Sequence, residues 1–167
     1  MTAERGVDAV DEIIEQWRRE RPDLDPSAKE ITGRIIRLAD LFQRTYAEAF
    51  RPLGINEADF GILSPLRRAG EPFELTPTEL ARHRMITSGG MTAAIDRVER
   101  RGLVSRTPNP SDRRGSLIRL TAEGLRVVEA AMERHADAEH RLVASLSPKD
   151  QATLRRLLKT LLADVDT

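Results

Sequence analysis

Two groups of side chains between residues 76 and 121 have types and spacings suited to contacts with duplex DNA. Hydroxyl groups can exchange hydrogen bonds with base edges, an alanine methyl can pack on a thymine methyl, and an arginine can reach a guanine or a phosphate. Small residues at a helix start also let backbone N–H groups approach a phosphate closely. The first group has these properties and comprises Thr87, Ser88, Gly89, Thr92, Ala93 and Arg97.

The second group is a pair of arginines, Arg113 and Arg114, which follow Asp112 in a turn-rich stretch. A narrow AT-rich minor groove has an enhanced negative potential that favours an inserted guanidinium. Asp112 cannot favourably face a phosphate, so we expect it to orient one of the arginines through a bidentate ion pair. The alternative is an ordinary charged surface loop.

Charge is distributed unevenly along the chain. The 27 basic and 27 acidic residues cancel, so no global field draws the protein to nucleic acid. The segment from Arg82 to Arg119 nevertheless holds nine arginines and three acids, and this basic excess coincides with the candidate DNA contacts. Some of these arginines can instead form a solvated face that pairs with Asp96 and Glu99. This alternative stays open for Arg97, Arg100 and Arg101.

A pair of helices is predicted to position the first group. The sequence 76–79, Thr-Pro-Thr-Glu, fits a capping box that starts one helix. A second cap at Thr87 or Ser88 starts the next helix, and Gly102 ends it. The inward residues of this second helix are expected to be Met91, Ile95 and Val98.

A hairpin is predicted to position the second group. The runs 103–107 and 116–120 are strand-like, and the link between them, 108–115, is rich in proline, asparagine, aspartate and glycine. A helix, a turn, a second helix and a hairpin in this order are typical of a winged helix-turn-helix. The pattern therefore predicts binding to double-stranded DNA.

Amphipathic helices are predicted on both sides of this motif. One covers about residues 3–20, and another starts with Asp25 as its cap and Pro26 in its first turn. A third is capped by Asn56, and two more begin after Thr121 and Ser147. The first, second and last helices carry apolar stripes that the motif's small core cannot cover, so we expect paired arms in a homodimer. The alternative is one monomeric bundle.

The expected fold is thus mostly α with a small β-hairpin wing. We expect N-terminal dimerisation helices in residues 1–54, a DNA-binding winged helix-turn-helix in 55–121, and C-terminal dimerisation helices in 122–167.

Several classes of function are not expected. The chain has no cysteine, so disulfides and thiol chemistry are excluded, and a reducing cytoplasm is the expected compartment. No phosphate-binding glycine loop or His-Glu-x-x-His motif is present, so neither an enzyme, a cofactor nor a metal site is predicted. Surface positions are expected for His135 and His140. No long apolar run or leader predicts a membrane span or a signal peptide.

The 22-residue stretch from Leu103 to Gly124 resembles the wing of the MarR family of dimeric winged-helix regulators, and it reads LVSRTPNPSDRRGSLIRLTAEG. That wing carries an Asp-x-Arg-Gly tip, which Asp112 to Gly115 match, followed by a Leu-Thr-x-x-Gly helix start. The resemblance implies that Arg114 enters the minor groove and that two recognition helices read a palindrome. The alternative is an architectural protein that binds DNA by charge alone, without an operator or an effector.

The N-terminal part is similar to the urate-responsive MarR regulators, which add a first helix bearing a tryptophan. The resemblance implies a ligand set of one tryptophan, one aspartate and two arginines. This chain keeps Trp17 and Arg106 but has Gly61 and Ala94 at the other two positions. We therefore expect an effector other than urate, an anionic or aromatic small molecule held by Arg106 and stacked on Trp17.

The alternative for Trp17 is packing in a dimer core. If the effector site exists, its ligand is expected to change the spacing of the two recognition helices and to release the operator, as in a repressor.

Overall fold

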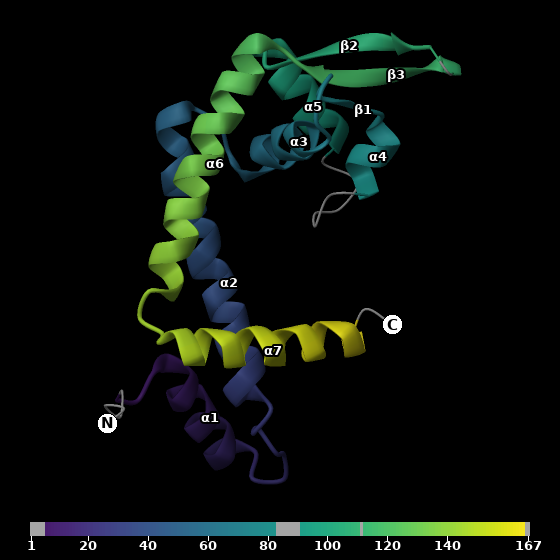
Figure 1. Cartoon of the computed structure of the whole chain (residues 1–167). Helices are drawn as coiled ribbons and strands as arrows, with labels where there is room; N and C mark the ends of the chain where they lie inside the picture. The colour runs from purple at the N-terminus through teal and green to yellow at the C-terminus, as the bar shows by residue number, and fades with distance from the viewer. Residues whose placement is uncertain (1–5, 83–90, 111, 166–167) are drawn as a thin grey trace. The chain divides into compact units, whose positions relative to one another are not determined.

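The computed structural model describes residues 6–82, 91–110 and 112–165, without the side chains of residues 113 and 114 (Figure 1). It divides into two compact units, Met1–Thr45 and Tyr46–Thr167. The division falls within helix α2 (Lys29–Phe50), so each unit is described by itself.

The first unit is built from helix α1 (Ala9–Glu20) and the N-terminal part of α2. Asp8 caps α1 in a capping box with Asp11, so the helix starts at Ala9 and not near residue 3 as predicted. The predicted start of the next helix at residues 25–26 is also wrong. A turn comes first, in which the Lys29 amide donates to the Pro26 carbonyl at 2.9 Å, and α2 begins at Lys29.

The two helices of the first unit are held by apolar and ionic contacts. Val10 and Ile14 are buried, and the Arg34 guanidinium donates hydrogen bonds to Asp8 and Asp11. Each carboxylate also accepts the other residue's backbone N–H, and this bond, with the arginine, holds the pKa values of both below the ordinary aspartate value. The ion pairs therefore favour the ionised acids at neutral pH.

The second unit contains a three-stranded antiparallel sheet in the order β1-β3-β2. Its strands are β1 (Glu74–Leu75), β2 (Val104–Asn109) and β3 (Asp112–Leu120). Pairing continues to Asn109 opposite Asp112, so most of the predicted link is strand. Strand β1 was not predicted because two residues are too few to show an alternating pattern. The mostly helical fold with a small sheet is confirmed.

Among the described residues, the second unit contains five further helices, and several of them begin at side-chain caps. They are α3 (Glu57–Arg68), α4 (Pro77–Arg82), α5 (Met91–Arg100), α6 (Ala122–Val143) and α7 (Pro148–Val165), and a short 3₁₀ turn, η1 (Arg51–Leu53), precedes α3. The predicted caps at Asn56, Thr76 and Thr121 are confirmed by hydrogen bonds from backbone amides three residues later to their side chains. Gly102 ends α5 with a φ of 69° that an L side chain rarely adopts.

The core of the second unit lies where α3, α5 and α6 meet the sheet. Its fully buried side chains include Leu63 and Leu66 of α3, Val98 of α5 and Val128 of α6. Helix α6 approaches the start of β2 so closely that a Cβ at residue 124 would come 1.8 Å from the Leu103 carbonyl oxygen. Glycine is therefore required at this position.

Helix α7 has no buried residue and exposes a stripe of apolar side chains. The stripe comprises Leu154, Leu157, Leu158, Leu161, Leu162 and Val165. Within the described ranges, no helix combines the length and apolarity needed to cross a membrane.

Candidate nucleic-acid interface

Helix α5 presents one apolar face to the core and a second face to solvent. Met91, Ile95 and Val98 are buried as predicted, whereas Thr92 and Ala93 are exposed. The other predicted readers, residues 87–89, lie outside the described residues, and their role stays a prediction. The exposed start of α5 therefore carries two of the predicted contact residues, Thr92 and Ala93.

Arg97 does not simply project into solvent, because it forms an ion pair with a buried acid. Its Nε lies 2.7 Å from Oδ1 of Asp59, whose side chain is only 2% exposed, while that of Arg97 is 35% exposed. A second guanidinium nitrogen of Arg97 lies 3.4 Å from the Asn56 side-chain oxygen. A buried carboxylate needs such partners to offset its lost hydration. The ion pair thus ties α5 to the N-terminus of α3.

Arg101, the residue directly after α5, reinforces this connection. Arg101 donates to the Gly54 carbonyl oxygen at 2.7 Å, and its guanidinium lies 3.7 Å from Asp59. The solvated face considered for Arg97 and Arg101 is therefore not their arrangement. Arg100 is exposed, and its Nε donates to a backbone carbonyl of α5.

The ion-pairing role of Asp59 was not predicted from the sequence. Asp59 also completes the cap of α3, where its carboxylate accepts the Asn56 backbone amide. A carboxylate that completes a cap is a weak signal for an ion pair with a residue 38 positions away, because only the tertiary fold brings the two together.

The acids of α5 are bound by an arginine of strand β2. Arg106 Nε lies 3.0 Å from a Glu99 carboxylate oxygen, and a second nitrogen of Arg106 contacts Asp96. Carboxylates facing a DNA backbone would repel phosphates, and this guanidinium offsets their charge. Arg106 therefore connects α5 to the β2–β3 hairpin.

The predicted ligand pair is distributed over both units. Trp17 lies on α1 in the first unit and is 42% exposed, whereas Arg106 lies in the second unit. Their joining in one effector site stays a prediction. Ala94 is buried in the core, and Gly61 lies within α3.

The tip of the wing is narrow. Asn109 pairs with Asp112 across it, and a Cβ at Gly115 would lie 3.2 Å from the Asp112 carboxylate. The backbone of Arg113 and Arg114 belongs to β3, while their side chains lie outside the described part. Their insertion into DNA, and the orienting role of Asp112, stay predictions.

The histidines occupy two different environments. The ring of His135 is half-buried and lies 4.4 Å from that of Tyr46 and 5.1 Å from that of Phe60, so the predicted surface position is wrong for it. Its position on the inward side of α6, which the sequence did not reveal, explains this packing. His140 is exposed as predicted.

In the part of the chain that the structure describes, no three His, Asp or Glu side chains cluster to bind a metal ion.

Comparison with known proteins shows that this chain is similar to transcriptional regulators of the MarR family in sequence and in structure. Residues 53–115 match the family model described as MarR family. The chain is 34% identical over 149 residues to the HTH-type transcriptional regulator PecS of Dickeya dadantii, covering 89% of this chain and 90% of PecS.

Two solved structures of DNA complexes resemble it as well. A mutant of MarR from Escherichia coli, complexed with operator DNA, is 33% identical with a TM-score of 0.71, over 83% of this chain and 99% of that one. Sco3205 from Streptomyces coelicolor, a MarR family transcriptional regulator in complex with DNA, is 28% identical with a TM-score of 0.74, over 85% and 93%.

Proposed function

This chain belongs to the MarR family of transcriptional regulators, and from that premise we propose that it is a homodimeric repressor that binds a palindromic operator and is released by a small molecule. The observation that carries the proposal is the anchoring of α5. Asp59 holds the helix from α3 and Arg106 holds it from the wing, while Thr92 and Ala93 stay exposed. A helix that recognises DNA must be held in a fixed orientation while the side chains that contact the DNA stay exposed.

The proposed DNA contacts extend from α5 to the wing. Residues 87–89 with Thr92 and Ala93 would face the major groove, and Arg113 and Arg114 the minor groove. Arg97 is used mainly to orient α5, and its exposed third can still contact a phosphate. Two related proteins have been solved in complex with DNA, which supports DNA binding by this chain.

A homodimer is proposed because the flanking helices expose contiguous stripes of apolar side chains, and not only the scattered apolar residues that are normal on a protein surface. Helix α7 exposes six large apolar side chains, and Ile31, Ile35, Leu38 and Leu41 of α2 are exposed in the first unit. Contiguous apolar stripes of this kind are typical of protein interfaces. A two-fold dimer would bury these apolar side chains and bring two copies of α5 to the same side of the dimer. We place this dimer in the cytoplasm, where the operator lies.

The proposed effector is an anionic or aromatic molecule that binds Arg106 and stacks on Trp17. This proposal rests on the resemblance to the MarR regulators that add an N-terminal helix bearing a tryptophan. Arg106 is already bound by Asp96 and Glu99 of α5. An anion must therefore compete with these acids, and its binding would remove a contact that orients the reading helix. This exchange gives the effector a physical route to lower operator affinity.

A gel-shift titration tests the proposal with the protein's own upstream intergenic DNA. Wild type should form a discrete complex, and Arg114→Ala should weaken it about 5- to 150-fold, since an arginine contact to DNA contributes about 1–3 kcal/mol. Arg100→Ala, which also removes an arginine, is the matched control. An equal loss in both variants, or binding to any duplex alike, would support the architectural alternative instead.

A further inference from the structure

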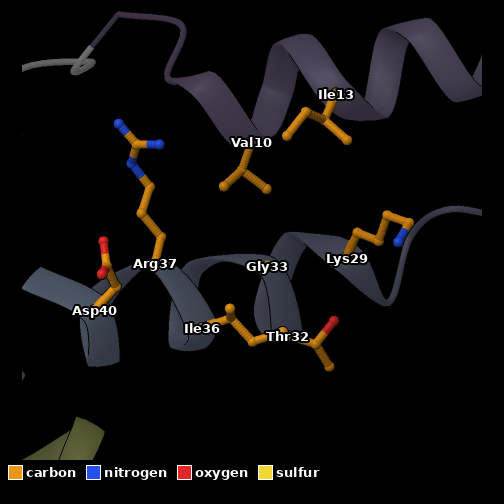
Figure 2. Close-up of a pocket in the computed structure, with 8 residues that line it drawn as sticks. All are labelled: Val10, Ile13, Lys29, Thr32, Gly33, Ile36, Arg37 and Asp40. Carbon is orange, nitrogen blue, oxygen red and sulfur yellow. The ribbon is translucent and has the colours of Figure 1, made fainter.

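The groove between α1 and α2 in the first unit has a volume of about 450 Å³ (Figure 2). Val10, Ile13 and Ile36 form its apolar wall. Because both helices belong to the proposed dimer interface, we expect a second copy to cover this groove. The contacts that can position the recognition helix lie in the second unit.

The end of the α2–η1 segment meets the C-terminal end of α5 through Arg101. Residues 46–50 of α2 belong to the second unit, and η1 continues them to Leu53. Carbonyl groups at the end of a helical segment have no partner within it. Arg101 supplies donors to two of them, since its Nη1 lies 2.7 Å from the Gly54 carbonyl oxygen and its Nη2 lies 3.5 Å from that of Leu53. The arginine therefore joins α5 to the end of η1.

Gly54 leaves room for this guanidinium. Its φ of 65° is left-handed, a conformation that an L side chain rarely adopts, and its amide donates to the Arg51 carbonyl to close the turn. A Cβ at this position would also lie 3.3 Å from Nη2 of Arg101, which is closer than an ordinary van der Waals contact. The position of Arg101 thus depends on a glycine 47 residues earlier in the chain.

The same guanidinium also reaches the start of α3. Nη1 of Arg101 lies 3.7 Å from Oδ2 of Asp59, and this buried carboxylate accepts the Asn56 amide in the cap of α3. Arg97 binds the other carboxylate oxygen of Asp59. Arg97 thus links α5 to α3, whereas Arg101 links α5 to both α3 and η1.

These partners favour an orienting role for Arg101 over a direct contact with DNA. An arginine on a DNA-binding surface can neutralise a phosphate, but this requires a guanidinium that is free to face the duplex. Arg101 instead donates to a helix end and lies beside a buried carboxylate, and only 35% of its side chain is exposed. Charge-assisted hydrogen bonds of this kind restrict the orientation of both partners.

We propose that Arg101 is a positioning residue for operator recognition. It fixes the C-terminal end of α5 against η1 and the start of α3, and it thereby sets the angle at which α5 meets DNA. This inference rests on the proposed function, because α5 must be the recognition helix. It extends the anchoring by Asp59 and Arg97, which joins α5 to α3.

Gel shifts of Arg101→Gln test the proposal, with the protein's own upstream intergenic DNA and a shuffled duplex of equal length and composition. Affinity for the upstream DNA should fall about tenfold, because a charge-assisted hydrogen bond is lost, and affinity for the shuffled duplex should change less than about twofold. The dependence of log affinity on log salt should keep its slope. Arg101→Lys keeps the charge but not the planar fork, so it should recover only part of the lost affinity. Arg100→Gln removes the neighbouring exposed arginine and is the matched control, in which neither affinity should fall.

Hydrogen exchange of the free full-length protein gives a second readout that does not depend on DNA. Arg101→Gln should speed amide exchange in residues 91–100 by up to about tenfold, while residues 125–138 of α6 keep the wild-type rates. Unchanged exchange in residues 91–100 would overturn the proposal. Equal acceleration in both helices would overturn it too, because it would show a general loss of stability.

A direct phosphate contact would give a different binding result. Arg101→Gln would then weaken both duplexes alike and reduce the salt slope by about 1, which would also overturn the proposal. Equal binding of both duplexes by the wild type would contradict the proposed operator instead. Exchange in residues 91–100 would still decide whether Arg101 fixes α5.

Discussion

The ion pair between Asp59 and Arg97 is expected to hold the recognition helix in place, and a double-mutant cycle can measure this. Removing one partner of a buried ion pair costs about 3–5 kcal/mol. The value should be smaller here, because the Arg97 side chain is 35% exposed and Arg101 remains 3.7 Å from Asp59. We expect a loss of about 2 kcal/mol in the free energy of unfolding for Arg97→Gln, and a similar loss for Asp59→Asn.

The double variant should lose only about 2.5 kcal/mol, which gives a coupling of about 1.5 kcal/mol. Urea unfolding at one fixed protomer concentration measures these values, and gel shift on the operator measures the effect on binding. Arg100→Gln is the control, since Arg100 is exposed and should change stability by less than about 0.5 kcal/mol. Additive losses, with a coupling near zero, would refute the anchoring role.

Three further outcomes follow from the structure. Gly124→Ala should destabilise the fold by about 3 kcal/mol in urea unfolding, because its Cβ would meet the Leu103 carbonyl at 1.8 Å; a loss under about 0.5 kcal/mol would contradict this close approach. The depressed pKa values of Asp8 and Asp11 contribute stability that is present above the ordinary value of 3.8 and lost as pH falls through the folded values. Tryptophan fluorescence should therefore report loosening of α1 with a midpoint below 3.8, and a midpoint above it would argue against these contacts. Leu161→Glu on the exposed face of α7 should shift the dimer toward monomer in sedimentation, and an unchanged dimer would exclude α7 from the interface.

Local signals in the sequence were sufficient to predict most helices and strands of the second unit. The caps at Asn56, Thr76 and Thr121 depend on side chains that bond amides three residues away, so the sequence alone can reveal them. The inward face of α5 follows from helical spacing in the same way. The element order, and with it the winged fold, was therefore predictable.

Long-range contacts were not predictable from such signals. Asp59 meets Arg97 and Arg106 meets Asp96 only because helices and strands pack in three dimensions. The same holds for His135, whose aromatic neighbours come from other helices. The starts of α1 and α2 were misplaced because more than one nearby residue could have served as the cap.

In the proposed homodimer, two anchored reading helices recognise a discrete operator. Nuclease footprinting on the upstream intergenic DNA tests it most directly. Wild type should protect one palindrome whose half-sites lie about 10 base pairs apart, or a multiple of this spacing, and Arg114→Ala should lose this protection. Uniform protection of any duplex, with a steep dependence on salt and no preferred site, would contradict it.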